Sequence, residues 1–383
     1  MKILILTHEF PPFEGGIATY CAEIARAAAE NGHQVTVFSP SYGKELEKSD
    51  AQNYPFKVVR FKGAIFTPRY DLLFMLWKTY RFLALKKFDL VHAADWAFVF
   101  ALRLLRHLQF KIPFLASVHG ADILGLKTSR FIKFLCCRDM YDYADWICAN
   151  SAHTKKRLLD ASPVLSENKI RVTPLGVNSF WFERAQSEED IRRRYSIPSH
   201  KKIILTVARL VEKKGHRFVF EALASLSSEE KDRLAYVVVG KGDGSYNEKT
   251  LFAFGESCGV QTFFTGAISP QSDRTLLLSI YAQADLFCML TQPPGEAFGL
   301  VYLEAAAQGL PAIGANCGGV PEVIEHDKTG ILIPSTDARA LRDAFRDFLD
   351  HPAKWKAMGE HARQRASIFN WQACAELTYK TTV

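Results

Sequence analysis

The sequence predicts an α/β protein built from two doubly wound parallel sheets. A chain of 383 residues is too long for one ordinary hydrophobic core, so two domains are expected. Short apolar β-runs alternate with helical segments, which is typical of parallel sheets covered by helices. This alternation stops at a linker, Pro174–Phe182, and then restarts, so each half is expected to form its own sheet.

The first half opens with a strand, a loop and a helix. Lys2–Leu6 is a short apolar β-run, and the loop that follows is stiffened by Pro11 and Pro12. Helical periodicity over Ile17–Glu30 stops at Asn31-Gly32. Further short strands, with helical stretches between the later ones, are predicted at Gln34–Phe38, Asp89–His92, Phe114–Val118, Trp146–Ala149 and Ile170–Thr173.

The second half repeats this pattern and ends in helices. Its predicted strands are Lys202–Ala208, Ala235–Gly240, Thr262–Thr265, Leu286–Leu290, Ala312–Ala315 and Gly330–Ile333. Its predicted helices are Gly215–Leu226, Tyr246–Cys258, Ser272–Ala282, Leu300–Gln308, Ala338–Asp350, Ala353–Phe369 and Trp371–Tyr379. Ligands of such sheets bind at the C-terminal ends of the strands, so we expect a site in the cleft between the two domains.

Composition indicates a soluble globular protein, with 48% hydrophobic and 23% charged residues. No apolar run approaches the roughly 20 residues of a membrane-spanning helix. The N-terminus turns polar at Thr7-His8, too early for a signal peptide, so a cytoplasmic location is expected. The eight cysteines form no C-x-x-C pair and no cluster with zinc-ligand spacing, which favours reduced, buried thiols.

The positive charge is concentrated in the first half of the chain. Residues 1–180 hold 24 Lys and Arg against 16 Asp and Glu. Within them, Phe56–Lys87 has eight basic residues, one acid and many aromatics. This composition suits peripheral contact with an anionic membrane at its inner face. A basic outer surface over core aromatics is the alternative, and the loops below give no support for nucleic-acid binding.

Two loops of the first half are candidates for ligand binding. Gly15 and Gly16 precede a helix, where backbone amides can approach an anion, although a tight turn explains the same pair. His119 and Asp122 follow the predicted strand that ends at Val118, although a lone histidine is often a core residue. Neither G-x-G-x-x-G nor a Walker loop is present.

Two loops of the second half carry charges suited to a nucleotide. Arg209 and Lys214 follow a strand and precede a helix, as a diphosphate site requires. Glu296 and Glu304 bracket a glycine turn at the start of a helix. Glutamates eight apart occur three times in the chain, but only this pair has glycines, an aromatic and small residues around it.

A second glycine-rich turn, Gly314–Glu322, follows the next strand and is expected to let backbone approach the same ligand. No D-x-D motif is present, so we expect no metal-bridged diphosphate. Fixed positive side chains must then neutralise the phosphates.

Taken together, these loops resemble the family 4 glycosyltransferases, retaining enzymes of the GT-B fold with two Rossmann-like domains facing each other across a deep cleft. The resemblance covers nearly the whole chain. Five motifs occur in the family's order: Gly15-Gly16, the His119 loop, Arg209 with Lys214, Glu296-x7-Glu304, and Gly318–Glu322. The linker departs from a common family form, with Leu175–Asn178 in place of N-G-V-D.

The resemblance implies an acceptor-binding domain over 1–176, joined by a returning C-terminal helix at about 371–383, and a donor-binding domain over 177–370. It implies that Glu296 and His119 contact the reacting sugar and act in catalysis. Arg209 and Lys214 would hold the diphosphate, and Glu304 the ribose. The full set of implied substrate-binding residues is Gly15, Gly16, Asp122, Arg209, Lys214, Ala297, Phe298, Gly299, Leu300 and Glu304.

The expected reaction is retaining transfer of a hexose from a nucleotide-diphosphate sugar, without metal or other cofactor. The expected acceptor is a lipid-linked or cell-envelope glycan, as in polysaccharide or lipopolysaccharide biosynthesis. A phosphorylase or epimerase of the same fold is the nearest alternative. A nicotinamide-dependent oxidoreductase predicts G-x-G-x-x-G where this chain has E-G-G-I-A-T, and a non-catalytic sugar-binding protein predicts fewer intact motifs.

Overall fold

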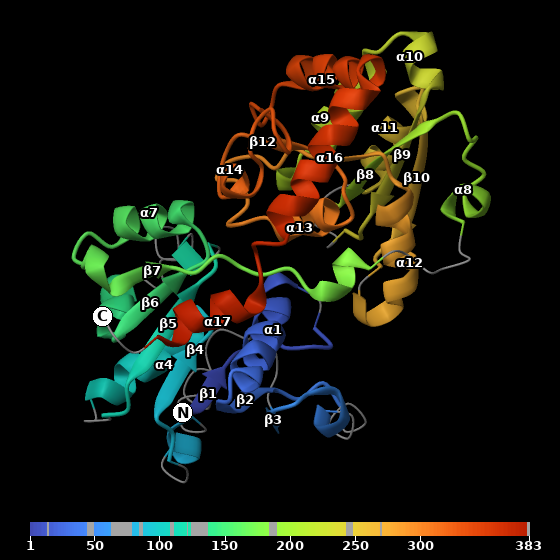
Figure 1. Cartoon of the computed structure of the whole chain (residues 1–383). Helices are drawn as coiled ribbons and strands as arrows, with labels where there is room; N and C mark the ends of the chain where they lie inside the picture. Colours follow the sequence, from blue (N-terminus) through green and yellow to red (C-terminus); the bar gives the residue numbers. More distant parts are fainter. Residues whose placement is uncertain are drawn as a thin grey trace. The chain divides into compact units, whose positions relative to one another are not determined.

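The computed structural model divides the chain into two compact units (Figure 1). The first unit is Met1–Gly176 with Asn370–Val383, and the second is Val177–Phe369. The residues described are 1–13, 15–43, 50–62, 79–83, 87–107, 111–120, 122–123, 137–183, 190–242, 248–268 and 270–380.

Across the described residues, the first unit contains a seven-stranded parallel sheet of order β3-β2-β1-β4-β5-β6-β7. Its strands are β1 (Lys2–Leu6), β2 (Gln34–Pro40), β3 (Lys57–Phe61), β4 (Leu90–Ala93), β5 (Phe114–Val118), β6 (Trp146–Ala149) and β7 (Ile170–Val172). Its helices are α1 (Gly16–Glu30), α4 (Trp96–His107), α7 (Ala152–Ala161) and α17 (Trp371–Tyr379), with 3-10 turns η1 (Cys137–Tyr143) and η2 (Glu167–Lys169). The strand order reverses between β1 and β4, which makes this edge the unit's switch point.

The central strands of this sheet are buried on both faces. Every residue of β4, β5 and β6 is buried, and so are Ile3–Leu6 of β1. Continuous apolar runs of this kind are typical of parallel sheets covered by helices on both sides. The apolar core includes Leu6, Phe98 and Phe114.

Helix α17 packs against α1 in the first unit, and Figure 1 shows the two helices side by side. The side chain of Asn370 caps α17 by accepting from the amide of Ala373 at 2.7 Å. Trp146 Nε1 donates to the Thr378 carbonyl at 2.9 Å, which ties the end of α17 to β6. The last helix is therefore an integral part of the unit formed by the first half of the chain.

The second unit has its own parallel sheet, with six strands over the described residues and the order β10-β9-β8-β11-β12-β13. The strands are β8 (Lys202–Val207), β9 (Leu234–Val239), β10 (Gln261–Gly266), β11 (Leu286–Met289), β12 (Ala312–Ala315) and β13 (Gly330–Ile333). The helices are α8 (Ile191–Arg194), α9 (His216–Ala224), α10 (Ser228–Asp232), α11 (Glu248–Ser257), α12 (Pro270–Gln283), α13 (Leu300–Ala307), α14 (Val320–Val323), α15 (Ala338–Asp350) and α16 (Pro352–Ala366), with η3 (Ser179–Phe182) and η4 (Glu212–Lys214). The switch point lies between β8 and β11.

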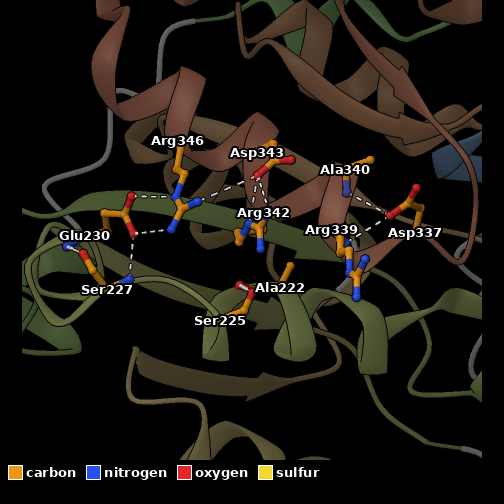
Figure 2. A network of polar contacts seen from close by, with 10 residues as sticks. All are labelled: Ala222, Ser225, Ser227, Glu230, Asp337, Arg339, Ala340, Arg342, Asp343 and Arg346. Carbon is orange, nitrogen blue, oxygen red and sulfur yellow. Dashed lines mark hydrogen bonds and ion pairs between the residues drawn. The ribbon is translucent and has the colours of Figure 1, made fainter.

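A polar network joins α10 to α15 on the second unit (Figure 2). Glu230 accepts from Arg346 Nε at 2.8 Å and from the Ser227 amide at 2.6 Å. Ser227 in turn caps α10 by accepting from the amide of Glu230, which completes a capping box. Asp337 caps the start of α15 in the same view. One carboxylate thus serves both a helix cap and an ion pair between helices.

The strand β3 was not predicted, and it corrects part of the interpretation of Phe56–Lys87. Phe56 and Phe61 are buried in the core. The side chain of Arg60 is only 4% exposed, and its Nε and Nη2 atoms lie 2.9 Å from the two carboxylate oxygens of Asp50. These three residues are therefore unavailable to a membrane. Residues 63–78 and 84–86 of the same stretch lie outside the described residues.

Over the described part of the chain, no helix combines the length and the apolar character needed to cross a membrane.

Candidate functional site

The loops that follow β8 and β11 leave the sheet on either side of the switch point in the second unit. The β8 loop carries Lys214, and the β11 loop carries Glu296. Lys214 Nζ donates to Glu296 Oε1 at 2.5 Å, and the two side chains are 15% and 20% exposed. The structure thus brings together two residues that lie 82 positions apart and that the sequence assigned to one ligand.

Glu296 is held in its ionised form. Burial by itself raises the pKa of this carboxyl, but the Lys214 ammonium and hydrogen bonds from Lys214 and Thr291 bring it below its usual value. Thr291 Oγ1 donates to the same carboxylate oxygen at 2.9 Å. An ionised carboxylate accepts hydrogen bonds or stabilises positive charge, and it has no proton to donate at neutral pH.

Backbone contacts fasten these two loops to each other. The Gln292 amide donates to the Lys213 carbonyl at 2.8 Å, and Gln292 Nε2 donates to the Glu212 carbonyl at 2.9 Å. Gly215 has φ +72°, and a Cβ there would lie 1.9 Å from the Leu290 carbonyl oxygen. Glycine is needed at this position for both reasons, and α9 begins one residue later than predicted.

The glycine-rich turn after β12 packs against the loop that carries Glu296. A Cβ on Gly318 would lie 2.4 Å from the Glu296 carbonyl oxygen, and one on Gly319 would lie 2.4 Å from that of Ala297. The Gly319 amide donates to the Glu296 carbonyl at 2.8 Å. Close packing of two backbones therefore explains why glycine stands at these positions. The sequence prediction had instead explained them by the approach of the backbone to a ligand.

The start of α13 presents free backbone donors. Within the described residues, the amides of Leu300 and Val301 have no protein acceptor, as expected for the first turn of a helix. Gly299 is the N-cap of this helix. The ring of Phe298 is buried and packs against Phe369 with centroids 5.9 Å apart, so Phe298 offers a ligand its backbone alone.

Glu304 lies one turn further along α13 and has a different environment from Glu296. Burial raises its pKa to about 7, and the hydrogen bond from Tyr281 only partly offsets that effect. Tyr281 OH donates to Glu304 Oε2 at 3.1 Å. This carboxyl is therefore poised to change its protonation state near neutral pH.

Arg209 is exposed at the end of β8, and no ion-pair partner for it is found among the described residues. Its backbone is held by His216, whose Nε2 lies 3.1 Å from the Arg209 carbonyl oxygen. Burial lowers the pKa of His216 to about 4, so its ring is neutral and donates this bond from Nε2. The guanidinium is free to bind an anion while its main chain is fixed.

The first unit presents a second set of groups at its own switch point. His8, after β1, lies beside Asp95, after β4, with Nδ1 2.9 Å from Oδ1 and its amide donating to Oδ2 at 2.6 Å. Burial opposes ionisation of Asp95, but the pair with His8 keeps the pKa of Asp95 below its usual range. These two residues were not singled out from the sequence, because each is an isolated polar residue there.

The predicted glycine pair opens the helix α1. A Cβ on Gly15 would approach the Glu9 carboxylate at 3.2 Å. A Cβ on Gly16 would meet no atom of the described residues within 4 Å, and Gly16 does not have a positive φ. Neither packing nor backbone conformation requires glycine at position 16, so the open space there is available to a ligand.

His119 and Asp122 lie after β5 and contact each other. The His119 amide donates to Asp122 Oδ2 at 2.9 Å, and His119 Nε2 lies 3.0 Å from the Ala94 carbonyl. Burial lowers the pKa of His119 to about 4, so the ring is neutral, with its proton on Nε2 and an acceptor at Nδ1. Burial raises the pKa of Asp122 to about 7.

The predicted residues thus fall into two groups, one in each unit. Sequence reasoning missed the residues that hold them in place, namely Thr291, Gln292, Tyr281, His216 and Tyr20. Thr291 and Gln292 directly follow a predicted strand, which is the signal that could have identified them. Across the described residues, no group of three or more His, Cys, Asp or Glu side chains is arranged to hold a metal ion.

Two family models match the chain in succession. Residues 14–179 match Glycosyltransferase Family 4, and residues 187–365 match Glycosyl transferases group 1. The first match falls almost wholly within the first unit, and the second match lies within the second unit.

Relatives and solved structures of similar length agree with these matches. The chain is 28% identical to a GDP-mannose-dependent alpha-(1-6)-phosphatidylinositol monomannoside mannosyltransferase of Mycobacterium tuberculosis, over 98% of this chain and 96% of that protein. It is 26% identical to a D-inositol 3-phosphate glycosyltransferase of Corynebacterium aurimucosum, over 98% of this chain and 94% of that protein. Anabaena HepE, solved with UDP and glucose, has a similar fold, with a TM-score of 0.81 and 20% identity over 100% of this chain and 99% of that chain.

Proposed function

The chain belongs to the family 4, group 1 glycosyltransferases of the GT-B fold, and on that premise we propose its donor, mechanism and acceptor. It transfers a hexose from a nucleotide-diphosphate sugar to a lipid-linked or cell-envelope acceptor, with retention of anomeric configuration. The sugar C1–O bond to the diphosphate breaks, and a C1–O bond to an acceptor hydroxyl forms. The hydroxyl proton leaves with the nucleoside diphosphate or enters solvent.

The ion pair between Lys214 and Glu296 is the observation that supports this function best. It puts a cation and a fixed anion side by side at a switch point, where doubly wound sheets bind nucleotides. Arg209 and the amides of Leu300 and Val301 add positive groups for the diphosphate. Such preorganised groups lower the barrier by stabilising negative charge that develops on the leaving diphosphate.

Glu296 contributes through its negative charge. Its lowered pKa keeps it ionised, so it orients hydroxyls of the sugar or stabilises positive charge near C1 as the glycosidic bond breaks. Glu304, whose pKa is about 7, accepts hydrogen bonds from the ribose when it is ionised. In the first unit, the Nδ1 atom of His119 accepts a hydrogen bond from a hydroxyl of the substrate sugar, and Gly16 leaves room for a phosphate or the acceptor.

The acceptor class has independent support. The Mycobacterium tuberculosis relative is described as acting on a phosphatidylinositol mannoside and the Corynebacterium aurimucosum relative on an inositol phosphate. An acceptor that carries a phosphate or a lipid is thus our proposal for this chain, met at the membrane surface. Flotation with anionic vesicles at modest salt tests that location, and the absence of binding would remove it.

A donor screen followed by a transfer assay tests the function itself. Thermal shifts across UDP-, GDP- and ADP-sugars identify the nucleotide, because a ligand that binds the folded state raises its stability. NMR of the product then shows whether the anomeric configuration is retained. We expect Glu296→Gln to abolish transfer in a folded protein. The main effect expected of Arg209→Ala is weaker binding of the nucleotide. Normal turnover in Glu296→Gln would contradict the proposed role.

The same assay separates the neighbouring alternatives and the role of metals. A phosphorylase releases a sugar phosphate and an epimerase returns an isomeric nucleotide sugar, so the products tell them from a transferase. We propose that fixed positive side chains and backbone amides neutralise the diphosphate without a metal ion. Undiminished transfer after exhaustive treatment with a chelator is the expected result, and recovery of lost activity on adding a divalent cation would contradict it.

A further inference from the structure

Tyr20 is a buried residue of α1 that lies against the ring of His119. The two ring centroids are 4.7 Å apart, with an interplanar angle of 66°. At the other end of the side chain, the Tyr20 hydroxyl lies 2.8 Å from Ser117 Oγ. Tyr20 therefore contacts His119 through its ring and is anchored to β5 through its hydroxyl.

The anchor continues as a chain of hydrogen bonds through the core. Ser117 Oγ lies 2.7 Å from His92 Nε2, and His92 Nδ1 lies 2.9 Å from the hydroxyl of Tyr379 on α17. All four hydrogen-bonded side chains, from Tyr20 to Tyr379, are buried. Trp371, at the start of α17, also lies beside the Tyr20 ring, with centroids 6.2 Å apart.

The four groups are coupled to one another because His92 has a single ring proton. Burial lowers the pKa of His92 to about 3, so the ring is neutral at physiological pH. A neutral imidazole donates from one nitrogen and accepts at the other. In the tautomer that accepts from Ser117 at Nε2, Ser117 has no second hydrogen, so Tyr20 donates to Ser117 Oγ and the His92 ring donates to Tyr379. The loss of one member then removes a partner from the next.

We propose that Tyr20 is a positioning residue that fixes the ring of His119, and that Ser117, His92 and Tyr379 make α17 part of its support. The proposal rests on the proposed role of His119 as a ligand of the substrate sugar. Among the described residues, the ring of His119 has one hydrogen bond, to the Ala94 carbonyl, which still allows the ring to rotate about that bond. Contact with the face or edge of a fixed aromatic ring removes that freedom.

A double-mutant cycle tests whether Tyr20 acts through His119. Tyr20→Phe keeps the aromatic ring and removes the hydroxyl that anchors it to Ser117. This substitution is introduced both into the natural protein and into the His119→Ala variant. We expect kcat to fall roughly tenfold in the natural chain, and less than about twofold in His119→Ala, because coupled residues are not additive. Tyr236→Phe is the matched control, since Tyr236 is a buried tyrosine bonded to Thr206 at 2.8 Å in the second unit. It should leave kcat unchanged.

The outcomes separate this proposal from the proposed function. Equal losses of kcat in both backgrounds would overturn the positioning role while leaving His119 in the site. An unchanged kcat in His119→Ala alone would remove His119 from the site and the positioning role with it. Histidine-selective ¹⁵N NMR gives a second readout that needs no activity. We expect one Nε2–H signal for His119, broadened or shifted in Tyr20→Phe and Tyr379→Phe, and an unaltered signal in both would also overturn the proposal.

Discussion

Replacing Lys214 with methionine tests both tasks proposed for its ammonium group. In the structure this group neutralises Glu296 at 2.5 Å and also lies in the loop proposed to bind the diphosphate. Methionine keeps most of the side-chain length and removes the charge. Lys214→Met is therefore expected to weaken nucleotide binding and to change the protonation of Glu296 at the same time.

The magnitude of the first effect follows from the exposure of the pair. A hydrogen bond to a charged group contributes about 1.5–3 kcal/mol, which corresponds to a factor of about 10 to 150 in Kd. Because the ammonium is already shared with Glu296, we expect the lower end, about a tenfold increase in Kd for the nucleoside diphosphate. The two side chains are 15% and 20% exposed, so solvent screens this loss only in part.

The second effect is a shift of the pH profile. Burial raises the pKa of Glu296, and the Lys214 ammonium is the main group that opposes it. Without Lys214 the pKa rises, so the active, ionised form is lost at a higher pH as the solution is acidified. The acid limb of the kcat profile should therefore move toward neutral pH in Lys214→Met.

Calorimetry with the nucleoside diphosphate measures the first effect, and kcat measured across the acid range measures the second. Lys213→Met is the matched control, because Lys213 is the adjacent, more exposed lysine and contributes the smallest of the effects that lower the Glu296 pKa. If Lys214→Met and Lys213→Met gave the same affinity and the same pH profile, the reasoning from the ion pair would be refuted.

Three further predictions concern other parts of the molecule. Ribose hydroxyls favour the ionised form of Glu304, whose pKa is about 7. Calorimetry should therefore show the affinity for a nucleotide sugar rising about tenfold between about pH 6 and pH 8. In Glu304→Gln the affinity should not depend on pH over this range. Gly16→Ala should leave the melting temperature unchanged or raised, because no atom of the described residues meets the new Cβ. It should still lower turnover at least about tenfold if a ligand occupies that space. Glu230→Ala removes both the capping box and the pair with Arg346, and it should lower stability by about 1–2 kcal/mol in thermal denaturation with activity per folded molecule unchanged.

The fold was predictable because its signals are local. Parallel strands buried on both faces appear as continuous apolar runs, and β5, β6, β12 and β13 have the predicted bounds. The strand β3 escaped prediction because it lies at the sheet edge and carries the charged Lys57 and Arg60 among its five residues. The role of Arg60 depends on Asp50, whose proximity no local pattern could reveal.

The candidate site was predictable in its residue types and less so in its contacts. Lys214 follows β8 and Glu296 follows β11. These two strands are neighbours in the sheet order β10-β9-β8-β11-β12-β13, so the loops that follow them are neighbours too. The glycines of Gly318–Glu322 have the same appearance in sequence whether they face a ligand or another backbone. The structure shows that Gly318 and Gly319 pack against the backbone of Glu296 and Ala297. Tyr20 and Tyr281 are indistinguishable from core tyrosines until their hydroxyl partners are known.

The two glutamates show how far environment divides residues that the sequence presents as a pair. Glu296 and Glu304 bracket one turn, yet Lys214 and Thr291 keep Glu296 ionised, whereas Glu304 accepts from the Tyr281 hydroxyl and burial raises its pKa. A sugar that develops positive charge needs a carboxylate that is ionised at every working pH, and Glu296 meets that requirement because of Lys214. The cation proposed to attract the diphosphate is thus also the group that prepares the anion for the sugar, which is why a single substitution at Lys214 should alter both binding and the pH dependence of turnover.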